Sequence, residues 1–344
     1  MNIKKRIDQE LAQYLRGLDT TYRLSSISSV LHQHINNFLL RKGKRVRPIL
    51  FVLGYLGYAK KPAKGLLRSA LSLELLHDFM LIHDDIIDKS ETRRGQPSMH
   101  TMLETHLRHF KNLKFNGQDL AIVIGDVVYA LALHAFLAIK ENKERKEQAL
   151  KKLIEAAIYT GSGEFVELLY GTQTIDTINK KDIFKIYDLK TANYTFASPL
   201  VIGATLAGAS AQQKNILFQY GIYLGRAFQI KDDIIGMFSE EQEMGKLALT
   251  DLREAKKTIL ILKAFANADT QQKSIMRSIL AKKNAGTADL LTMRRIITAT
   301  GALAFAKSEV TRLIRKAQNL HQKLTMKPAI RSQLGAYTQA ILDV

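Results

Sequence analysis

The stretch that decides the fold is residues 72–88, which read SLELLHDFMLIHDDIID. This segment is apolar all round at helical spacing, and it predicts an inner helix of a helical protein. Near its end, Asp84 and Asp88 fall one turn apart on the same face, and Asp85 lies beside them. Three carboxylates this close repel one another, and burial in an apolar helix removes their hydration.

A divalent cation would relieve this repulsion. Carboxylate oxygens, together with waters and phosphate oxygens, suit octahedral Mg²⁺. The alternative is a solvated acidic face, which is the usual role of aspartate clusters on exposed helices. The apolar neighbours of the cluster, among them Ile82, Ile86 and Ile87, argue against an exposed face and favour metal binding.

Two cationic segments accompany the acidic cluster. Residues 91–97 (ETRRGQP) follow it at once, and residues 43–48 (GKRVRP) precede it. Arginine presents a rigid fork of donors that suits phosphate oxygens, so carboxylates, Mg²⁺ and arginines together indicate a bound polyphosphate. Each cationic segment alone is weak evidence, because 43–48 is equally typical of a basic helix end and is too short for a Walker A loop.

A second acidic pair repeats this order. Residues 225–236 (GRAFQIKDDIIG) place Asp232 and Asp233 among apolar residues at helical spacing. Lys246, Lys256 and Lys257 follow. A phosphate held by metal on one side and by lysine on the other needs both kinds of group.

The rest of the chain favours helices. Five prolines are present, and none lies within 98–198 or 200–327. Long proline-free stretches rich in Leu, Ala, Lys, Glu and Ile are typical of helices, and the alternation expected of strands is rare. We predict an all-α fold. Three segments look apolar all round and should be inner helices wrapped by amphipathic outer ones: 66–88, 121–139 and 197–209.

No Gly/Ser/Pro-rich linker divides the chain. A length of 344 residues alone would suggest two domains at about 150 residues each. The basic stretch 108–118 and the stretch 239–250 look like surface loops rather than domain boundaries. We therefore predict a single domain over residues 1–344.

The net charge of +19 indicates an anionic partner: nucleic acid, a membrane surface or a phosphorylated small molecule. A basic nucleic-acid binder would explain the charge but not three carboxylates in an apolar helix, so no nucleic-acid partner is expected. The absence of cysteine excludes disulfides and thiolate sites. Neither a signal peptide nor a membrane span is expected, so we predict a cytoplasmic protein with at most peripheral membrane contact.

Taken together, the motifs resemble those of the trans-isoprenyl diphosphate synthases of the polyprenyl synthetase family. The resemblance extends over about residues 40–260, in the family's order and at similar spacing. A lone DDxxD motif would be weak evidence, whereas an ordered set is strong. The residues that carry it are Gly43-Lys44, Arg47-Pro48, Asp84-Asp85-x-x-Asp88, Arg93-Arg94-Gly95-x-Pro97, Gly125-Asp126, Lys190-Thr191, Phe228-Gln229-x-x-Asp232-Asp233, Gly245-Lys246 and Lys256.

The resemblance implies an isoprenoid synthase fold, in which inner helices surround a central tunnel. It also implies a transferase that condenses isopentenyl diphosphate head-to-tail with an allylic diphosphate of five to fifteen carbons. Three Mg²⁺ ions would bridge the allylic diphosphate to the two acidic helices, with Asp84, Asp88 and Asp232 as ligands. A homodimer is implied as well, and the apolar stretch 121–139 would either supply its interface or belong to the core.

The same resemblance assigns the substrate contacts. The cations that would hold the allylic diphosphate are Arg93, Lys190, Lys246 and Lys256. The residues that match the isopentenyl diphosphate pocket are Lys44, Arg47, His77 and Arg94. Thr191, Gln229 and the Phe228 ring lie where the family stabilises the allylic cation by dipoles and a π face. The catalytic set is therefore expected to be Lys190, Thr191, Gln229 and Lys246.

Two departures from the family pattern matter. Gly236 stands where many members have aspartate, which we expect to leave activity intact but to alter metal affinity. Residues 163–167 (GEFVE) carry glutamates where glutamine and aspartate are more usual. Glu167 either hydrogen-bonds a catalytic lysine or is an ordinary helix acid.

Product length is the finer question. Phe79 lies five residues before Asp84, where short-chain members have an aromatic tunnel floor, and Met80 adds no second aromatic. The resemblance favours a C20 product, with C15 or a medium-chain product as alternatives, although Phe79 equally fits core packing. A terpene cyclase is the other alternative, and the cations of the isopentenyl diphosphate pocket argue against it. The two acidic pairs argue against a non-catalytic partner subunit.

Overall fold

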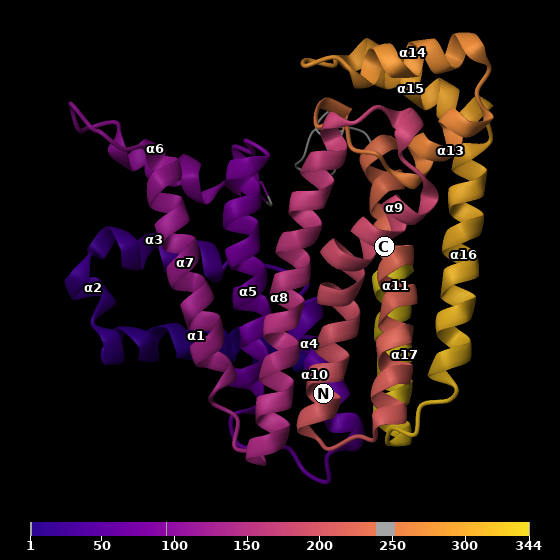
Figure 1. The fold of residues 1–344 in the computed structure, drawn as a ribbon. Helices are drawn as coiled ribbons and strands as arrows, with labels where there is room; N and C mark the ends of the chain where they lie inside the picture. The colour runs from indigo at the N-terminus through magenta and orange to yellow at the C-terminus, as the bar shows by residue number, and fades with distance from the viewer. Residues whose placement is uncertain (1, 94, 239–251, 344) are drawn as a thin grey trace. The chain divides into compact units, whose positions relative to one another are not determined.

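Helices make up most of the protein, which confirms the all-α prediction. The computed structural model describes residues 2–93, 95–238 and 252–343 (Figure 1). Within these ranges, the strands form one two-residue hairpin, β1 (Thr92–Arg93) with β2 (Gln96–Pro97). The helices of the first part of the chain are α1 (Ile3–Tyr22), α2 (Leu24–Ile27), α3 (Ser29–Leu39), α4 (Val46–Tyr58), α5 (Leu66–Ile87), α6 (Met99–Leu107), α7 (Gly117–Phe136) and α8 (Lys143–Thr172).

The second part of the chain is also helical. Its helices are η1 (Ile175–Thr177), α9 (Lys180–Ile186), η2 (Tyr187–Ala197), α10 (Ser198–Leu206), α11 (Ala211–Phe238), α13 (Ile259–Asn267), α14 (Thr270–Leu280), α15 (Thr287–Ala299), α16 (Ala302–His321) and α17 (Pro328–Asp343). Of these, η1 is a 3₁₀ helix and η2 is a π-helix. The predicted loop 239–250 lies outside the described residues.

The chain divides into two compact units. The first unit comprises Met1–Leu150 and Ile202–Gly208, and the second comprises Lys151–Val201 and Ala209–Val344. Two of the three boundaries fall inside helices, α8 and α10, and the third lies between α10 and α11. The single domain stays a prediction.

Helix α5 forms the buried centre of the first unit, as its sequence predicts. Every residue from Ala70 to Leu76 is buried, and the helix packs against α7 and α4. The charge on this stretch, Glu74, is offset by Arg45, whose Nη1 lies 2.7 Å from Oε1; both side chains are 2% exposed. Burial on every side explains why this segment has no polar face.

Helix α7 differs from the prediction of an inner helix over 121–139. One side packs on α5 and α6, but the other exposes Ile122 and Val123, which are 44% and 58% exposed. Of the described helices, α7 is the one long and apolar enough to cross a membrane. The core helix of a soluble protein can have the same length and composition. The sequence alone does not distinguish an inner helix from one with an apolar outer face. The exposed loop expected before α7 is confirmed over residues 108–116.

Helix α11 packs against η2 and α16 in the second unit. Its glycines permit a close approach to the π-helix: a Cβ at Gly225 or Gly221 would come closer than 3.0 Å to the backbone of Ala192 or Ala197, respectively. Any larger residue would push the two backbones apart. The predicted inner segment 197–209 is buried from Ala197 to Leu206.

Candidate active site

The first acidic cluster lies at the end of α5. Asp88 is the residue that ends the helix, and its N–H donates to the Asp84 carbonyl over 2.8 Å. Asp84 and Asp88 are half-buried, whereas the Asp85 side chain is fully buried. The one-turn spacing expected of Asp84 and Asp88 is therefore present at the point where α5 becomes accessible.

Arg93 neutralises the buried Asp85. Its Nε donates to Asp85 Oδ1 over 2.8 Å, and its Nη2 donates to the same oxygen. Burial alone would lower the pKa of Arg93, but the hydrogen bond and the charge of Asp85, with Asp84 and Asp88 nearby, raise it overall. The β1–β2 hairpin thus folds back on the acidic cluster and places a permanent positive charge beside it. Arg94 lies outside the described residues.

The acidic cluster has the donor chemistry of a magnesium site. Asp84 and Asp88 supply carboxylate oxygens, which Mg²⁺ prefers, and it commonly takes its remaining ligands from water and substrate phosphates. No group of three or more His, Cys, Asp or Glu side chains that could hold a metal occurs among the described residues. The residues present therefore fit a cation that is held jointly by two carboxylates and a bound diphosphate, not one enclosed by the protein.

The cations upstream surround the start of α4. Lys44 is exposed just before the helix, and Arg47 is half-buried in its first turn. The N-terminus of a helix attracts anions, so this arrangement favours a phosphate more than the basic helix end that was the alternative. Arg45 separates the two with a φ of 54°, and it is anchored by Glu74 and by Asp8, 2.9 Å from Arg45 Nε. His77 lies half-buried on α5.

Lys190 is the centre of charge in the second unit. It belongs to the π-helix η2, and its Nζ forms ion pairs with Glu164 and with Glu167, the latter at 2.5 Å. Gly163 makes this possible, since a Cβ there would lie 2.9 Å from the Lys190 backbone nitrogen. Of the two alternatives for Glu167, the hydrogen bond to the lysine is the one observed. Glu164 adds a second carboxylate to the same amino group.

A partly buried hydrogen-bond chain positions the polar groups next to Lys190. Thr191 Oγ1 donates to Gln229 Oε1 over 2.6 Å, and Gln229 Nε2 donates to Asp233 Oδ1 over 3.0 Å. The Tyr187 hydroxyl donates to the other oxygen of Asp233 and accepts from the Ile259 N–H over 3.0 Å. Burial and the adjacent carboxylate raise the pKa of Tyr187 well above its usual value, so this hydroxyl stays a donor.

The second acidic pair therefore has two distinct environments. Asp233 is buried within the hydrogen-bond chain, whereas Asp232 is half-buried and is the more accessible carboxylate for a metal. Phe228 stacks at a tilt on Phe196, with ring centroids 5.4 Å apart. Lys256 pairs with Glu254 at 2.6 Å. Lys246 lies outside the described residues.

The residues expected to govern chain length lie on α5. Phe79 and Met80 are both half-buried. The Phe79 ring meets His83 edge-on at 4.7 Å and Tyr129 of α7 at 5.2 Å between centroids. Phe79 thus belongs to an aromatic group one to two turns before the acidic cluster.

Some contributors were missed by sequence reasoning. Tyr187 and Arg45 have no motif of their own, and their roles depend on partners 46 and 29 residues away, respectively. The signal for Glu164 was present in GEFVE, where two acids three residues apart share a helix face.

Comparison with known proteins identifies the chain's relatives. A model of the polyprenyl synthetase family matches residues 28–297. The short chain isoprenyl diphosphate synthase of Methanocaldococcus jannaschii is 31% identical over 82% of this chain and 78% of its own. The geranylfarnesyl diphosphate synthase of Aeropyrum pernix is 32% identical over 88% and 89%. A geranylgeranyl pyrophosphate synthase structure from Corynebacterium glutamicum, complexed with isoprenyl diphosphate and magnesium, superimposes with a TM-score of 0.89 at 26% identity, covering 99% of this chain and 98% of that one.

Proposed function

We propose a specific role for each part of the active site of this chain, which belongs to the polyprenyl synthetase family. The chain has the isoprenoid synthase fold, and it is a trans-isoprenyl diphosphate synthase. Enzymes of this family join isopentenyl diphosphate to an allylic diphosphate. The proposal concerns the residues that bind substrate and metal, the length of the product and the oligomeric state.

The reaction requires charge more than a nucleophile. The allylic C–O bond breaks, and its electron pair leaves with the diphosphate. The double bond of isopentenyl diphosphate attacks the resulting allylic cation, and the proton lost in closing the new alkene goes to the released diphosphate. Fixed positive charge around the departing group lowers the barrier. This chain, which has no cysteine, supplies that charge through arginines and lysines.

Asp84 and Asp88 in the first unit and Asp232 in the second are the proposed magnesium ligands. Bound Mg²⁺ would supply the positive charge that the leaving diphosphate needs. The observation that carries this assignment is the pairing of Asp85 with Arg93, because it uses the central aspartate internally and leaves its neighbours as the accessible carboxylates.

The polar groups of η2 and α11 act on the allylic substrate. Lys190 would bind the allylic diphosphate, and Glu164 and Glu167 hold its amino group in place. Thr191 and Gln229 would present oxygen dipoles to the developing cation, and their mutual hydrogen bond fixes the direction of both. Arg93, Lys246 and Lys256 would complete the allylic site. Lys44, Arg47, His77 and Arg94 would bind isopentenyl diphosphate.

The proposed product is the C20 diphosphate. Phe79 is packed against Tyr129 and His83, so its ring is braced and can act as a fixed barrier to a growing chain. The most direct test incubates the protein with labelled isopentenyl diphosphate, Mg²⁺ and, separately, C5, C10 and C15 allylic primers. We expect C20 as the end product from every primer accepted. No elongation with any primer would overturn the assignment.

A homodimer is the proposed assembly. Helix α8 exposes large apolar residues along the part that lies in the second unit, including Ile158 (59%) and Phe165 (64%). Helix α7 exposes Ile122 and Val123 in the first unit. Exposed apolar surfaces of this kind mark interaction sites, and a second copy is the partner that the family resemblance implies. Light scattering of the wild-type protein and of Phe165→Glu tests this: a dimer that becomes a monomer supports the proposal, and a wild-type monomer overturns it.

A further inference from the structure

A cavity of about 370 Å³ lies at the opposite end of α5 from the acidic cluster. Its lining residues all belong to the first unit and come from α1, α4, the loop before α5, the first turn of α5 and the loop after α7. Leu66 begins α5, and Asp84 follows 18 residues later. At 1.5 Å per residue this is about 27 Å, so the cavity is separate from the acidic cluster.

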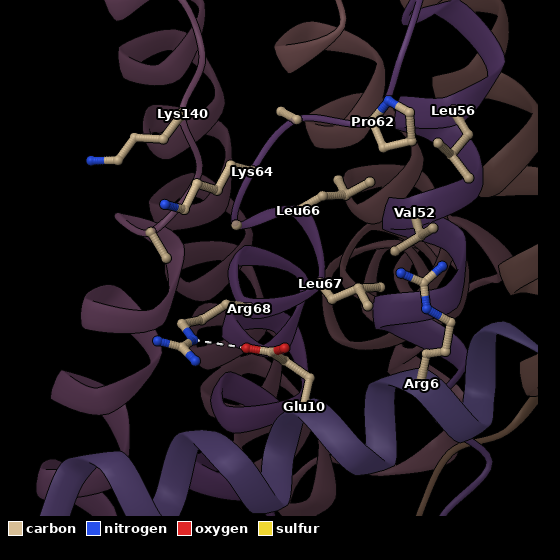
Figure 2. Close-up of a pocket in the computed structure, with 13 residues that line it drawn as sticks. Arg6, Glu10, Val52, Leu56, Pro62, Lys64, Leu66, Leu67, Arg68 and Lys140 are labelled. Carbon is tan, nitrogen blue, oxygen red and sulfur yellow. Dashed lines mark hydrogen bonds and ion pairs between the residues drawn. The ribbon is translucent and has the colours of Figure 1, made fainter. Parts of the chain in front are cut away.

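One part of the cavity wall is apolar, and Arg6 of α1 lies beside Val52 there (Figure 2). Val52 and Leu56 of α4 face Leu66 and Leu67 of α5 across it (Figure 2). The volume lies at the lower end of the range of small-molecule sites, about 300–1,000 Å³. A space of this size and lining suits part of an aliphatic chain.

The rim of the cavity is cationic. Lys64 and Lys140 extend to the same side of it (Figure 2), and the Lys140 N–H donates to the Lys64 carbonyl over 2.9 Å, which ties their two loops together. Within the described part of the chain, neither amino group has a carboxylate partner. Glu10 is the acid that lines the cavity, and Arg68 neutralises it over 2.8 Å. The rim therefore carries excess positive charge.

The start of α5 adds to this charge. Gly65 precedes the helix with a φ of 84°, and no side chain caps the first turn. Gly65 is required here, because a Cβ would lie closer than 3.0 Å to the Ala138 backbone. The Leu66 N–H donates to the Ala63 carbonyl over 3.3 Å. The N–H groups of a helix start, at the positive end of its dipole, bind phosphates readily. The helix start and the two lysines line the same cavity.

We propose that this cavity is a second binding site, for an amphiphilic phosphate. The phosphate or diphosphate group would contact Lys64, Lys140 and the start of α5, and the aliphatic chain would lie against the leucines. Two classes of molecule share this chemistry: a soluble prenyl diphosphate and an anionic phospholipid. The proposal does not depend on which residues carry out catalysis.

The test measures binding of geranylgeranyl diphosphate by calorimetry in EDTA, which removes the metal that the active site requires. We expect saturable binding by the wild-type protein. A Lys64→Ala/Lys140→Ala variant should bind at least tenfold more weakly. The matched control is Lys60→Ala/Lys61→Ala, which removes the same charge from exposed positions of the same loop outside the cavity and should stay within twofold of the wild type.

A second variant tests the apolar interior. Ala63→Trp places an indole in the cavity and should abolish binding while the lysines remain. Because the chain has no other tryptophan, its fluorescence also reports whether the indole is buried. Circular dichroism melting and the condensation rate, measured on each variant, show that the fold and the catalytic site are intact.

Vesicles distinguish the two sources of ligand. Binding to phosphatidylglycerol vesicles but not to phosphatidylcholine vesicles, lost in the double-lysine variant, would identify a phospholipid headgroup. Binding of the soluble diphosphate alone would identify a prenyl diphosphate. The proposal is overturned if neither probe binds, or if binding survives both the double-lysine substitution and Ala63→Trp.

Discussion

Replacing Tyr187 with phenylalanine removes one hydroxyl from the buried chain that joins η2, α11 and α13. That hydroxyl donates to the Asp233 carboxylate and accepts from the Ile259 N–H. A hydrogen bond to a charged group contributes about 1.5–3 kcal/mol and a neutral one about 0.5–1.5 kcal/mol. The two together predict a loss of about 2–4.5 kcal/mol in the free energy of unfolding.

The matched control is Tyr220→Phe on α11, the helix that carries Asp233. The Tyr220 hydroxyl is buried and pairs with the neutral Thr338 hydroxyl at 2.7 Å, so its loss should cost only about 0.5–1.5 kcal/mol. With an unfolding entropy of about 2.1 cal/mol/K per residue, a loss of roughly 0.7 kcal/mol in the free energy of unfolding lowers the Tm of this chain by one degree. Calorimetry should therefore show Tm falling by about 3–6 °C for Tyr187→Phe and by about 1–2 °C for Tyr220→Phe.

The same substitution should also slow condensation. Asp233 loses the Tyr187 donor, so Gln229 and its partner Thr191 are less firmly oriented. We expect kcat to fall severalfold with little change in KM for isopentenyl diphosphate, whereas Tyr220→Phe should leave both unchanged. Equal melting temperatures for the two variants, or a Tyr187→Phe protein as stable as the wild type, would refute the reasoning.

Four further substitutions test other parts of the structure. Gly225→Ala should destabilise the protein by about 1–3 kcal/mol in thermal melts, because its Cβ meets the backbone of Ala192. Gly161→Ala, whose Cβ would have no neighbour within 4 Å, should instead stabilise the protein by about 0.5–1 kcal/mol. A stability change of the same sign in both variants would contradict the close-approach argument. Phe79→Ala should lengthen the product in chromatographic sizing, and an unchanged product would leave Phe79 a core residue. Asp84→Ala should abolish turnover while melting as the wild type does; near-normal rates across a Mg²⁺ titration would remove Asp84 from the metal site. Hydrogen bonding to Arg312 lowers the pKa of Glu309 below its usual 4.5, so the folded state binds fewer protons than the unfolded state. The stability that this group contributes is therefore lost as pH falls through the lowered pKa. Glu309→Gln should flatten the acid dependence of the free energy of unfolding, and an unchanged slope would mean that Glu309 does not contribute to it.

Much of the fold could be predicted because its inner helices are apolar on every side. That pattern identified α5 and α10 correctly. It failed for α7, since an apolar outer face that is exposed in the single chain has the same composition as a buried one. The π-helix was not predicted, and its close approach to α11 depends on Gly221 and Gly225, which lie more than 20 residues away.

In the candidate site, too, local features could be predicted from the sequence and tertiary contacts could not. The spacing of Asp84 and Asp88 is local helix geometry, so it can be read from adjacent residues. The pairing of Asp85 with Arg93 depends on a hairpin that folds back, and the pairing of Tyr187 with Asp233 depends on two helices meeting. Contacts made by the tertiary fold leave no periodic pattern in the sequence. The family assignment, in contrast, was recovered because the motifs are short and ordered.

The π-helix makes η2 sensitive to chain length in a way that an α-helix is not. Its i→i+5 bonding accommodates an extra residue within an otherwise helical run from α9 into α10. Deleting one residue between Tyr187 and Lys190 would let the segment rewind as an α-helix, and each residue of such a helix turns by about 100°. Evolutionary insertions and deletions here would therefore exchange which side chains face α11, so this segment can change the chemistry of the site without a single amino-acid substitution.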